Sequence, residues 1–298
     1  MLHANKKPYP NEILDTSGSG FTHTTHIDEN ELVAHGIQID QWDEIASLIP
    51  IDNSLFFKWG GEIGTPIELT YSFVGSDFVN YDDHYYDVTS SGVKDPLLVA
   101  SIDFMNSTTG AKPIDFTEAE KQTISDIFDD WSDASGLTFT EVEDSRDNYG
   151  EIRLSKLDFS VWANLDSIYS EAAGFAYHPL GGDGYYYEPI GGDIFLDDSY
   201  TLGDGYYEHV LAHEIGHALG LAHPFEGYAA FGTADSSYSV AKTVMTYNDE
   251  GNLYPVSPMP LDIAAMQFCM VATHRRTVVM TFMSLMSHCL TRVRVNIL

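Results

Sequence analysis

The sequence predicts an α+β fold in which a mixed sheet packs against two long helices. Three observations support it. Short β-prone runs and helical segments follow one another in the order strand, helix, strand, strand, strand, helix. The two longest helical segments carry clear start or stop signals. The chain has 298 residues, of which 44% are hydrophobic and 13% aromatic, enough for one large domain or two ordinary ones with a substantial core.

The clearest helix lies in the stretch DFTEAEKQTISDIFDDWSDASG. Thr117 and Glu120 have the spacing of a capping box, and Gly136 is placed to end the helix. Its apolar residues repeat at intervals of three and four, which places them on one face that can pack against a sheet: Ile124, Ile127, Phe128 and Trp131.

Strands are expected where β-branched and aromatic residues gather in short runs, at IELTYSFVG, LTFTEVED and EIRLSKLDF. The later stretch GFAYHPLGGDGYYYEPIGGDIFLDD predicts a strand, a glycine-rich loop and a strand. Its GGDGYYYEP unit is not a good calcium-binding nonapeptide, because Tyr186 occupies the aspartate position and the unit does not repeat. A second long helix is expected from about Tyr207 to Leu219, and an apolar helix at PLDIAAMQ.

Charge and cysteine content exclude some classes of function and of metal site. A net charge of −31 argues against nucleic-acid binding, since a polyanion would be repelled. The sequence contains no run of about 18 apolar residues, so we expect no membrane-spanning helix. No N-terminal secretory signal is seen. The only cysteines, Cys269 and Cys289, lie near the C-terminus. A metal in the body of the chain must therefore be held by nitrogen and oxygen.

The segment AHEIGHALGLAHPFEG concentrates metal-binding chemistry. His213 and His217 are four residues apart, so a helix directs both imidazoles at one point. Gly220 is the residue best able to end the helix in a left-handed turn, which lets His223 return to the same point. Pro224 prevents the helix from resuming. The three imidazoles therefore form a candidate metal site.

Three neutral imidazoles suit Zn²⁺ and leave a position for water. Glu214 follows the first ligand and points about 100° away around the helix, so it faces the water rather than binding the metal. That is the placement of a general base. We therefore expect a zinc-dependent endopeptidase that hydrolyses peptide bonds with metal-activated water. His209 and His178 are not required by the pattern, and we interpret each as either a solvated residue or one that supports the ligands without binding the metal.

The combination of HEIGHALGLAH with a later VMTY resembles the metzincin zinc endopeptidases. Flanking segments are similar to the serralysin branch of secreted bacterial proteases: IELTYSF, AGFAYHP, GGDIFLDD, TVMTY and SPMPLDIAAMQ. The resemblance covers roughly residues 55–267. It implies a metzincin-like domain with a twisted mixed sheet, an antiparallel edge strand, two long helices and an active-site helix that ends at Gly220.

The resemblance also implies further site residues. Met245 would form the apolar floor beneath the zinc, and Tyr247 would ligate zinc or swing away to stabilise the oxyanion. The edge strand would bind extended peptide by adding it to the sheet, through Gly174, Phe175, Ala176 and Tyr177. The implied partners are extended peptide or protein substrates, and we expect a monomer.

The expected organisation has three parts: a leader or pro-like segment (1–60), the zinc protease domain (61–267) and an anomalous tail (268–298). The tail contains no Asp or Glu, although the chain holds 45, and it carries both cysteines. Read from the third base of the Phe268 codon, the codons of Phe268 to Val271 give Leu, then Tyr or His, then Gly, which is compatible with the family. We therefore expect an out-of-frame tail, which an early stop codon in the shifted frame would refute.

The family continues into calcium-binding repeats and a C-terminal export signal, and neither is seen here. Calcium is thus expected from the resemblance only, and secretion for the intact form. Three alternatives stay open. One is a truncated relative without catalytic activity, and another is a non-proteolytic zinc-binding module that uses its acidic surface for adhesion. The third is another metzincin branch, which would differ in the residue after the third histidine and not in its chemistry.

Overall fold

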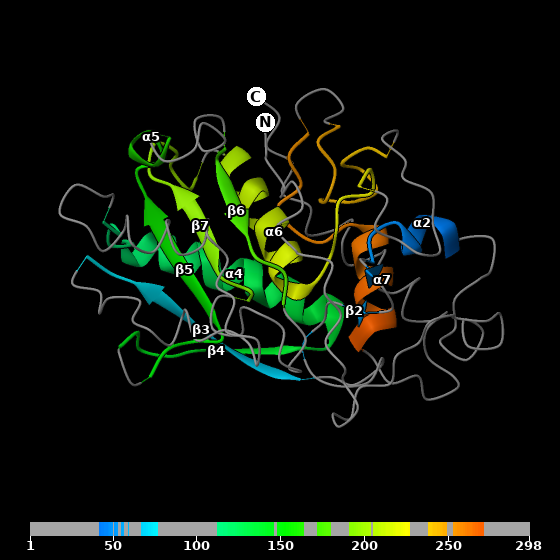
Figure 1. The fold of residues 1–298 in the computed structure, drawn as a ribbon, viewed down its shortest axis with the longest axis horizontal. Helices are drawn as coiled ribbons and strands as arrows, with labels where there is room; N and C mark the ends of the chain where they lie inside the picture. Colours follow the sequence, from blue (N-terminus) through cyan, green and yellow to red (C-terminus); the bar gives the residue numbers. More distant parts are fainter. Residues whose placement is uncertain are drawn as a thin grey trace.

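The computed structural model describes residues 42–49, 51–52, 55–56, 59, 67–76, 112–145, 148–163, 172–179, 191–203, 205–226, 238–248 and 253–270. They form an α+β arrangement built around one five-stranded sheet (Figure 1). In chain order its elements are α2 (Trp42–Ala46), β1 (Ile51–Asp52), β2 (Leu55–Phe56), β3 (Glu68–Val74), α4 (Glu118–Ser135), β4 (Thr138–Glu141), β5 (Ile152–Leu157), α5 (Phe159–Trp162), β6 (Gly174–Ala176), β7 (Ile194–Asp197), α6 (Tyr206–Leu219) and α7 (Pro260–Met270).

The sheet is mixed, as predicted, and its strands follow the order β4-β3-β5-β7-β6. Neighbouring strands from β4 to β7 run parallel, whereas β6 lies antiparallel to β7, with Phe175 opposite Phe195. Among the described strands, the short β1 and β2 pair only with each other. The sheet therefore ends in one reversed strand, which lies beside α6 (Figure 1).

Helix α4 forms as its sequence signals predict. The Thr117 hydroxyl accepts the backbone N–H of Glu120, whose carboxylate accepts the Thr117 N–H at 2.7 Å. Gly136 ends the helix with φ 71°. The predicted apolar face is buried against the sheet and α6: Ile124, Ile127, Phe128 and Trp131.

Side-chain alternation gives the sheet two apolar faces. On β7, Ile194 and Leu196 belong to the main core shared with α4 and α6. Phe195 points to the other side, where its ring stacks on Phe175 with centroids 4.7 Å apart and also meets Trp162 of α5. Both faces of the strands nearest α6 are thus covered by apolar side chains.

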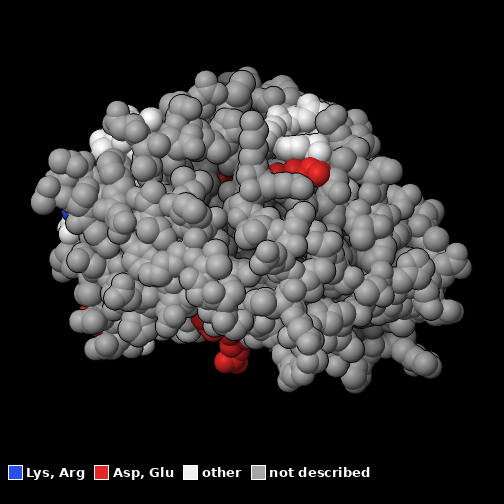
Figure 2. All heavy atoms as spheres, in the orientation of Figure 1, with Lys and Arg blue, Asp and Glu red and all other residues white. Residues whose placement is uncertain are grey.

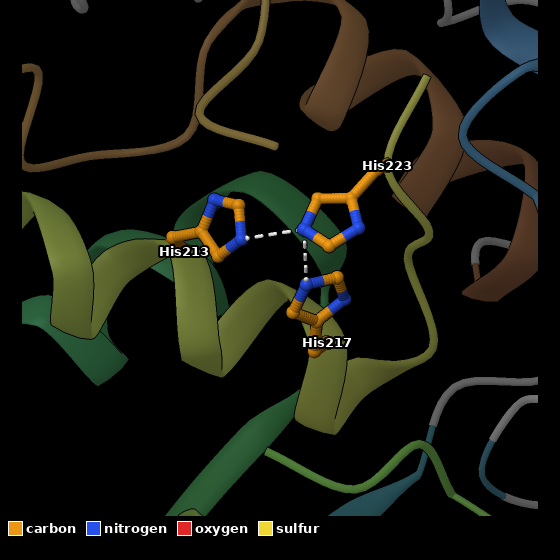
Figure 3. A group of neighbouring side chains, drawn as sticks. All are labelled: His213, His217 and His223. Carbon is orange, nitrogen blue, oxygen red and sulfur yellow. Dashed lines mark hydrogen bonds between the residues drawn. The ribbon is translucent and has the colours of Figure 1, made fainter. Parts of the chain in front are cut away.

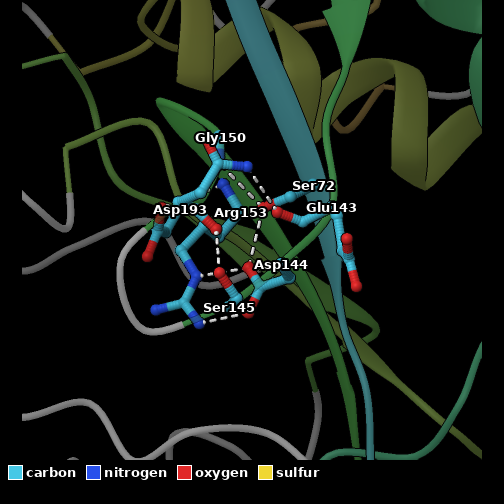
Figure 4. A network of polar contacts seen from close by, with 8 residues as sticks. Ser72, Glu143, Asp144, Ser145, Gly150, Arg153 and Asp193 are labelled. Atoms are coloured by element: carbon cyan, nitrogen blue, oxygen red, sulfur yellow. Dashed lines mark hydrogen bonds and ion pairs between the residues drawn. The ribbon is translucent and has the colours of Figure 1, made fainter.

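A polar network fixes the loop that joins β4 to β5 (Figure 4). The Arg153 guanidinium binds both carboxylate oxygens of Asp144, at 2.8 and 2.7 Å, with the two side chains only 3% and 5% exposed. The Ser72 hydroxyl donates to the same carboxylate, and the backbone N–H of Arg153 donates to Asp193. These contacts tie β3, β5 and the residue preceding β7 together.

The segment before β3 is part of the same core. Ile45, Leu48 and Ile49 are buried, and helix α2 lies beside α7 although the two are far apart in sequence (Figure 1). The Leu48 carbonyl accepts the N–H of Ala222 at 2.8 Å, and the Trp59 indole donates to the Ala218 carbonyl at 2.7 Å. The described part of residues 1–60 thus packs directly against α6 and the turn after it.

The division into residues 1–60, 61–267 and 268–298 stays a prediction. Helix α7 continues through the expected boundary, and Phe268, Cys269 and Met270 are buried. Residues 271–298, which include most of the anomalous tail, lie outside the described residues. Within the described ranges, no helix has both the length and the apolar character needed to cross a bilayer. On the face in Figure 2, described acidic side chains reach the surface at separate places.

Candidate metal centre and active site

Helix α6 and the turn that ends it bring the three predicted histidines together (Figure 3). Gly220 adopts φ 109°, a left-handed conformation that side chains other than glycine's rarely accept. The next N–H, of Leu221, bonds back to the Gly216 carbonyl at 2.9 Å. This closes the turn and sends the chain back past the helix end, so that His223 faces the two helical imidazoles.

The three imidazoles converge through their Nε2 atoms. The Nε2 of His223 lies 3.0 Å from that of His213 and 3.0 Å from that of His217 (Figure 3). All three side chains are buried. In the described part of the chain, this is the one group of three or more metal-binding side chains whose ligand atoms all lie within 4.8 Å of one another.

The other ring nitrogens determine which atoms carry protons. His213 Nδ1 and His217 Nδ1 lie 2.7 Å from the carbonyl oxygens of Val244 and Leu221. A carbonyl only accepts, so each Nδ1 carries a hydrogen and each Nε2 presents a lone pair. The Nδ1 of His223 faces the Glu226 carboxylate at 2.8 Å, although their alignment is poor for a hydrogen bond.

These tautomers fit a cation. The Nε2 lone pairs of His213 and His217 are both directed at His223 Nε2. A cation among the three Nε2 atoms could be bound by all three rings. Burial lowers the pKa of each of these histidines well below its usual value, so all three are neutral near pH 7. Neutral imidazole is the form that binds metals, and an all-nitrogen set suits zinc.

Glu214 is buried beside this cluster without belonging to it. Its side chain is directed toward β6: a Cβ placed on Gly174 would lie 3.1 Å from the Glu214 Cγ. Burial raises the pKa of the Glu214 carboxyl to about 8, and its Oε2 has no hydrogen-bond partner among the described residues. A nearby dication would lower this pKa and favour the ionised form. The carboxyl group is therefore able to exchange a proton.

Met245 lies against the active-site helix. Its Sδ would be 2.4 Å from a Cβ at Gly216, so only glycine at that position admits the thioether. Gly216 stands immediately before the second histidine, and Met245 is fully buried. The methionine therefore packs against the helix turn between His213 and His217, and its role as a floor beneath a metal stays a prediction.

Tyr247 is the exposed member of the group. Its side chain is 37% exposed, and its hydroxyl lies within hydrogen-bonding distance of His223 Nε2, at 2.8 Å. Phe225 stacks on the His223 ring at 4.8 Å and meets the Tyr247 ring at 4.9 Å. A phenol that is both solvent-exposed and in contact with a ligand nitrogen can reach a molecule bound at the cluster.

The predicted substrate strand is β6. Gly174 and Ala176 are buried on the side facing α6, whereas Phe175 and Tyr177 are half-buried on the opposite side. Backbone pairing continues past the strand, since the Tyr177 N–H donates to Asp193 at 3.0 Å. Among the described strands none pairs with the outer edge of β6. The strand therefore presents backbone groups beside Glu214.

Asp262 is a buried residue near the site that sequence reasoning did not single out. Its carboxylate accepts the Thr243 hydroxyl and the backbone N–H groups of Val244 and Met259, at 2.5, 2.9 and 2.8 Å. Val244 in turn supplies the carbonyl that orients His213. A carboxylate in the otherwise apolar PLDIAAMQ was the available signal, because a buried charge needs partners.

The structure also gives contacts for His209, which we expected to be solvated or to support the ligands, and for Glu226, which sequence reasoning did not single out. His209, which the motif did not require, is buried and its Nδ1 donates to the Pro255 carbonyl at 2.8 Å. Glu226 follows His223 by three residues and approaches its Nδ1. Neither contact has a sequence signature, since both depend on how distant loops fold.

Comparison with known proteins agrees with this geometry. Residues 104–249 match the matrixin peptidase family. The chain is 32% identical to serralysin B of Dickeya chrysanthemi over 54% of its own length, and 30% identical to metallopeptidase AprA of Pseudomonas marginalis over 51%. It is also 26% identical to serralysin of Proteus mirabilis over 86% of its length. The chain is thus similar to matrixin and to serralysin-type metallopeptidases. The chain covers only part of each relative's length: 35% of serralysin B, 34% of AprA and 48% of the Proteus mirabilis serralysin.

Proposed function

We propose that this serralysin-like chain is a zinc-dependent endopeptidase with His213, His217 and His223 as metal ligands. The convergence of three neutral imidazoles through their Nε2 atoms, with Nδ1 of His213 and His217 bound to backbone carbonyls, carries the proposal. The buried Glu214 beside them argues for catalysis over a purely structural site, since a closed structural site has no use for a base.

The chain's own residues supply the proton transfers. Zinc at the imidazoles would lower the pKa of water and polarise a carbonyl. The Glu214 carboxylate removes a proton from the attacking water and delivers it to the departing amine nitrogen. The Tyr247 hydroxyl donates a hydrogen bond to the oxygen on which negative charge develops. Met245 holds the ligand-bearing helix turn from below.

Strand β6 would position the substrate. An extended peptide that adds to its outer edge pairs with the backbone of Gly174 to Tyr177, beside the Glu214 carboxyl. This favours flexible or unfolded segments of proteins, because a folded substrate cannot offer an unpaired strand. We propose an extracellular place of action, which the similarity to serralysins supports. Calcium remains an expectation of that similarity.

Hydrolysis of casein by the purified chain tests the proposal. A strong chelator should abolish cleavage, and added zinc should restore it. Glu214→Gln keeps the size of the side chain but removes the base, so cleavage should fall by about 10²–10⁴-fold while one zinc per chain is retained. Zinc binding without any wild-type hydrolysis would instead support the catalytically inactive relative or the zinc-binding adhesion module.

A further inference from the structure

We propose that His178 is a positioning residue for His217 and acts through the Leu221 carbonyl. His178 carries no role in the proposed reaction, and the zinc-binding pattern does not include it. The inference deepens the proposed function, on which it rests, because it concerns how firmly one of the three ligands is held.

One oxygen atom receives both histidines. The Leu221 carbonyl accepts the His217 Nδ1–H at 2.7 Å and the His178 Nε2–H at 2.9 Å. The two imidazoles also touch directly, edge to face, with centroids 5.2 Å apart and planes at 79°. His178 therefore contacts the ligand His217 by ring packing and by a shared acceptor.

His178 itself is held by the sheet. It is the second residue after β6. The residue between, Tyr177, exchanges backbone hydrogen bonds with the segment before β7: its N–H donates to the Asp193 carbonyl and its carbonyl accepts from the Gly192 N–H, both at 3.0 Å. His178 thus connects the proposed substrate strand with the turn that carries the ligands.

Leu221 occupies the turn between the second and third ligands. Its N–H donates to the Gly216 carbonyl, and the N–H of the next residue, Ala222, donates to the Leu48 carbonyl. A carbonyl can accept two hydrogen bonds, so His178 fills the second position without displacing His217. The Nε2–H of the His178 ring thereby fixes the direction of the Leu221 carbonyl. Because His217 donates to the same carbonyl, the orientation of the His217 ring is fixed with it.

The ligand His213 is secured in the same way. Its acceptor carbonyl belongs to Val244, whose N–H is bound by the buried Asp262. In both cases the residue that orients a ligand is anchored by a second group. Loss of such outer partners typically weakens metal binding or activity by about 10–100-fold.

Two substitutions in the full chain separate positioning from bulk. His178→Leu fills most of the space but cannot donate, whereas His178→Gln can place an amide N–H near the position of Nε2. The measurement is the rate at which a chromogenic chelator removes zinc. We expect zinc release about 10-fold faster in the leucine variant and near the wild-type rate in the glutamine variant.

Tyr207→Phe is the matched control. It also removes one buried hydrogen bond from a ring residue to a backbone carbonyl, that of Tyr207 to Asp197 at 2.6 Å, but on a part of α6 away from the ligand turn. Its unfolding temperature should fall while its zinc release rate stays unchanged.

Equal zinc release in wild type and His178→Leu would overturn the inference, as would equally fast release from the glutamine and leucine variants. If the wild type binds zinc and hydrolyses casein, and the leucine variant releases zinc at the same rate, this inference alone is wrong. A wild-type chain that binds no zinc would remove the proposed function and the inference together.

Discussion

At the scale of single residues, Tyr247 makes the most direct contact with the ligand cluster from the solvent side. Its hydroxyl reaches His223 Nε2 at 2.8 Å while more than a third of its side chain stays exposed. If this phenol stabilises the oxyanion, Tyr247→Phe should lower kcat by about 10²-fold and leave KM nearly unchanged. Steady-state kinetics on a peptide substrate, with zinc content measured in parallel, check this. An unchanged kcat would assign Tyr247 to packing only.

The residues that sequence could predict at this site are those with a spacing rule. A helix dictates that His213 and His217 share a face, and Gly220 provides the turn for His223. The groups that orient the rings follow no such rule. Val244 and Leu221 act through backbone carbonyls, which every residue possesses, and His178 reaches its position through pairing of β6 with the segment before β7.

At the scale of elements, α6 and the loop carrying Met245 fit together because Gly216 lacks a side chain. A Cβ there would lie 2.4 Å from the Met245 Sδ, inside any real contact distance. Gly216→Ala should therefore destabilise the fold by about 1–3 kcal/mol, despite alanine's better helix propensity. Chemical denaturation of the metal-free protein gives this value without the contribution of zinc binding.

The same contact predicts coupling between the two positions. Met245→Ala removes the thioether and leaves room for a methyl group at Gly216. The loss of unfolding free energy in the double variant should then be smaller than the sum of the losses in the two single variants, by about 0.5–3 kcal/mol. Additive costs would mean that the two residues do not meet. Zinc release rates of all three variants would show whether the contact also supports the ligands.

The N-terminal elements supply a second packing test. The Trp59 indole N–H donates to the Ala218 carbonyl in the last turn of α6, where helix carbonyls lack partners within the helix. Trp59→Phe keeps an aromatic ring but removes this donor, so stability should fall by about 1–3 kcal/mol. Denaturant unfolding measures the change, and a variant as stable as wild type would show that solvent replaces the bond.

Local signals and long-range pairing explain what could be predicted of the fold. Thr117, Glu120 and Gly136 define α4 through contacts within a few residues, and those predictions are confirmed. The mixed sheet followed from the order of elements, but the position of β3 between β4 and β5 depends on pairing between segments far apart. The packing of Leu48 and Trp59 on α6 also depends on tertiary contacts, which a polar, weakly patterned N-terminal sequence does not reveal.

At the scale of the whole molecule, Asp262 joins two parts of the active-site region. It belongs to the first turn of α7, yet its three hydrogen bonds hold the loop from Thr243 to Met245 as well as the residue before its own helix. Helix α7 also packs on α4 and α2. The carboxylate therefore connects the core around the sheet with the loop beneath the ligand cluster.

This position gives stability a specific pH dependence. Burial raises the pKa of Asp262 from 3.8 to about 6, although the hydrogen bonds it accepts oppose the shift. The folded state therefore holds this proton more tightly than the unfolded state does. The resulting stabilisation is fully present below about pH 4 and is lost as pH rises through about 6.

Asp262→Asn tests this dependence against a nearly isosteric side chain that does not titrate. The amide oxygen can still accept backbone N–H groups, so the variant should fold. Relative to the variant, the wild type should lose roughly 2–3 kcal/mol of unfolding free energy between pH 4 and pH 8, the size that a shift of about two pKa units implies. Denaturant unfolding of both metal-free proteins at these two pH values measures the change, and chelation keeps the pH dependence of zinc binding out of the comparison. If the difference in unfolding free energy between the two proteins is the same at both pH values, the hydrogen bonds offset the effect of burial. If the wild type instead gains stability relative to the variant as pH rises, the folded protein favours the charged carboxylate.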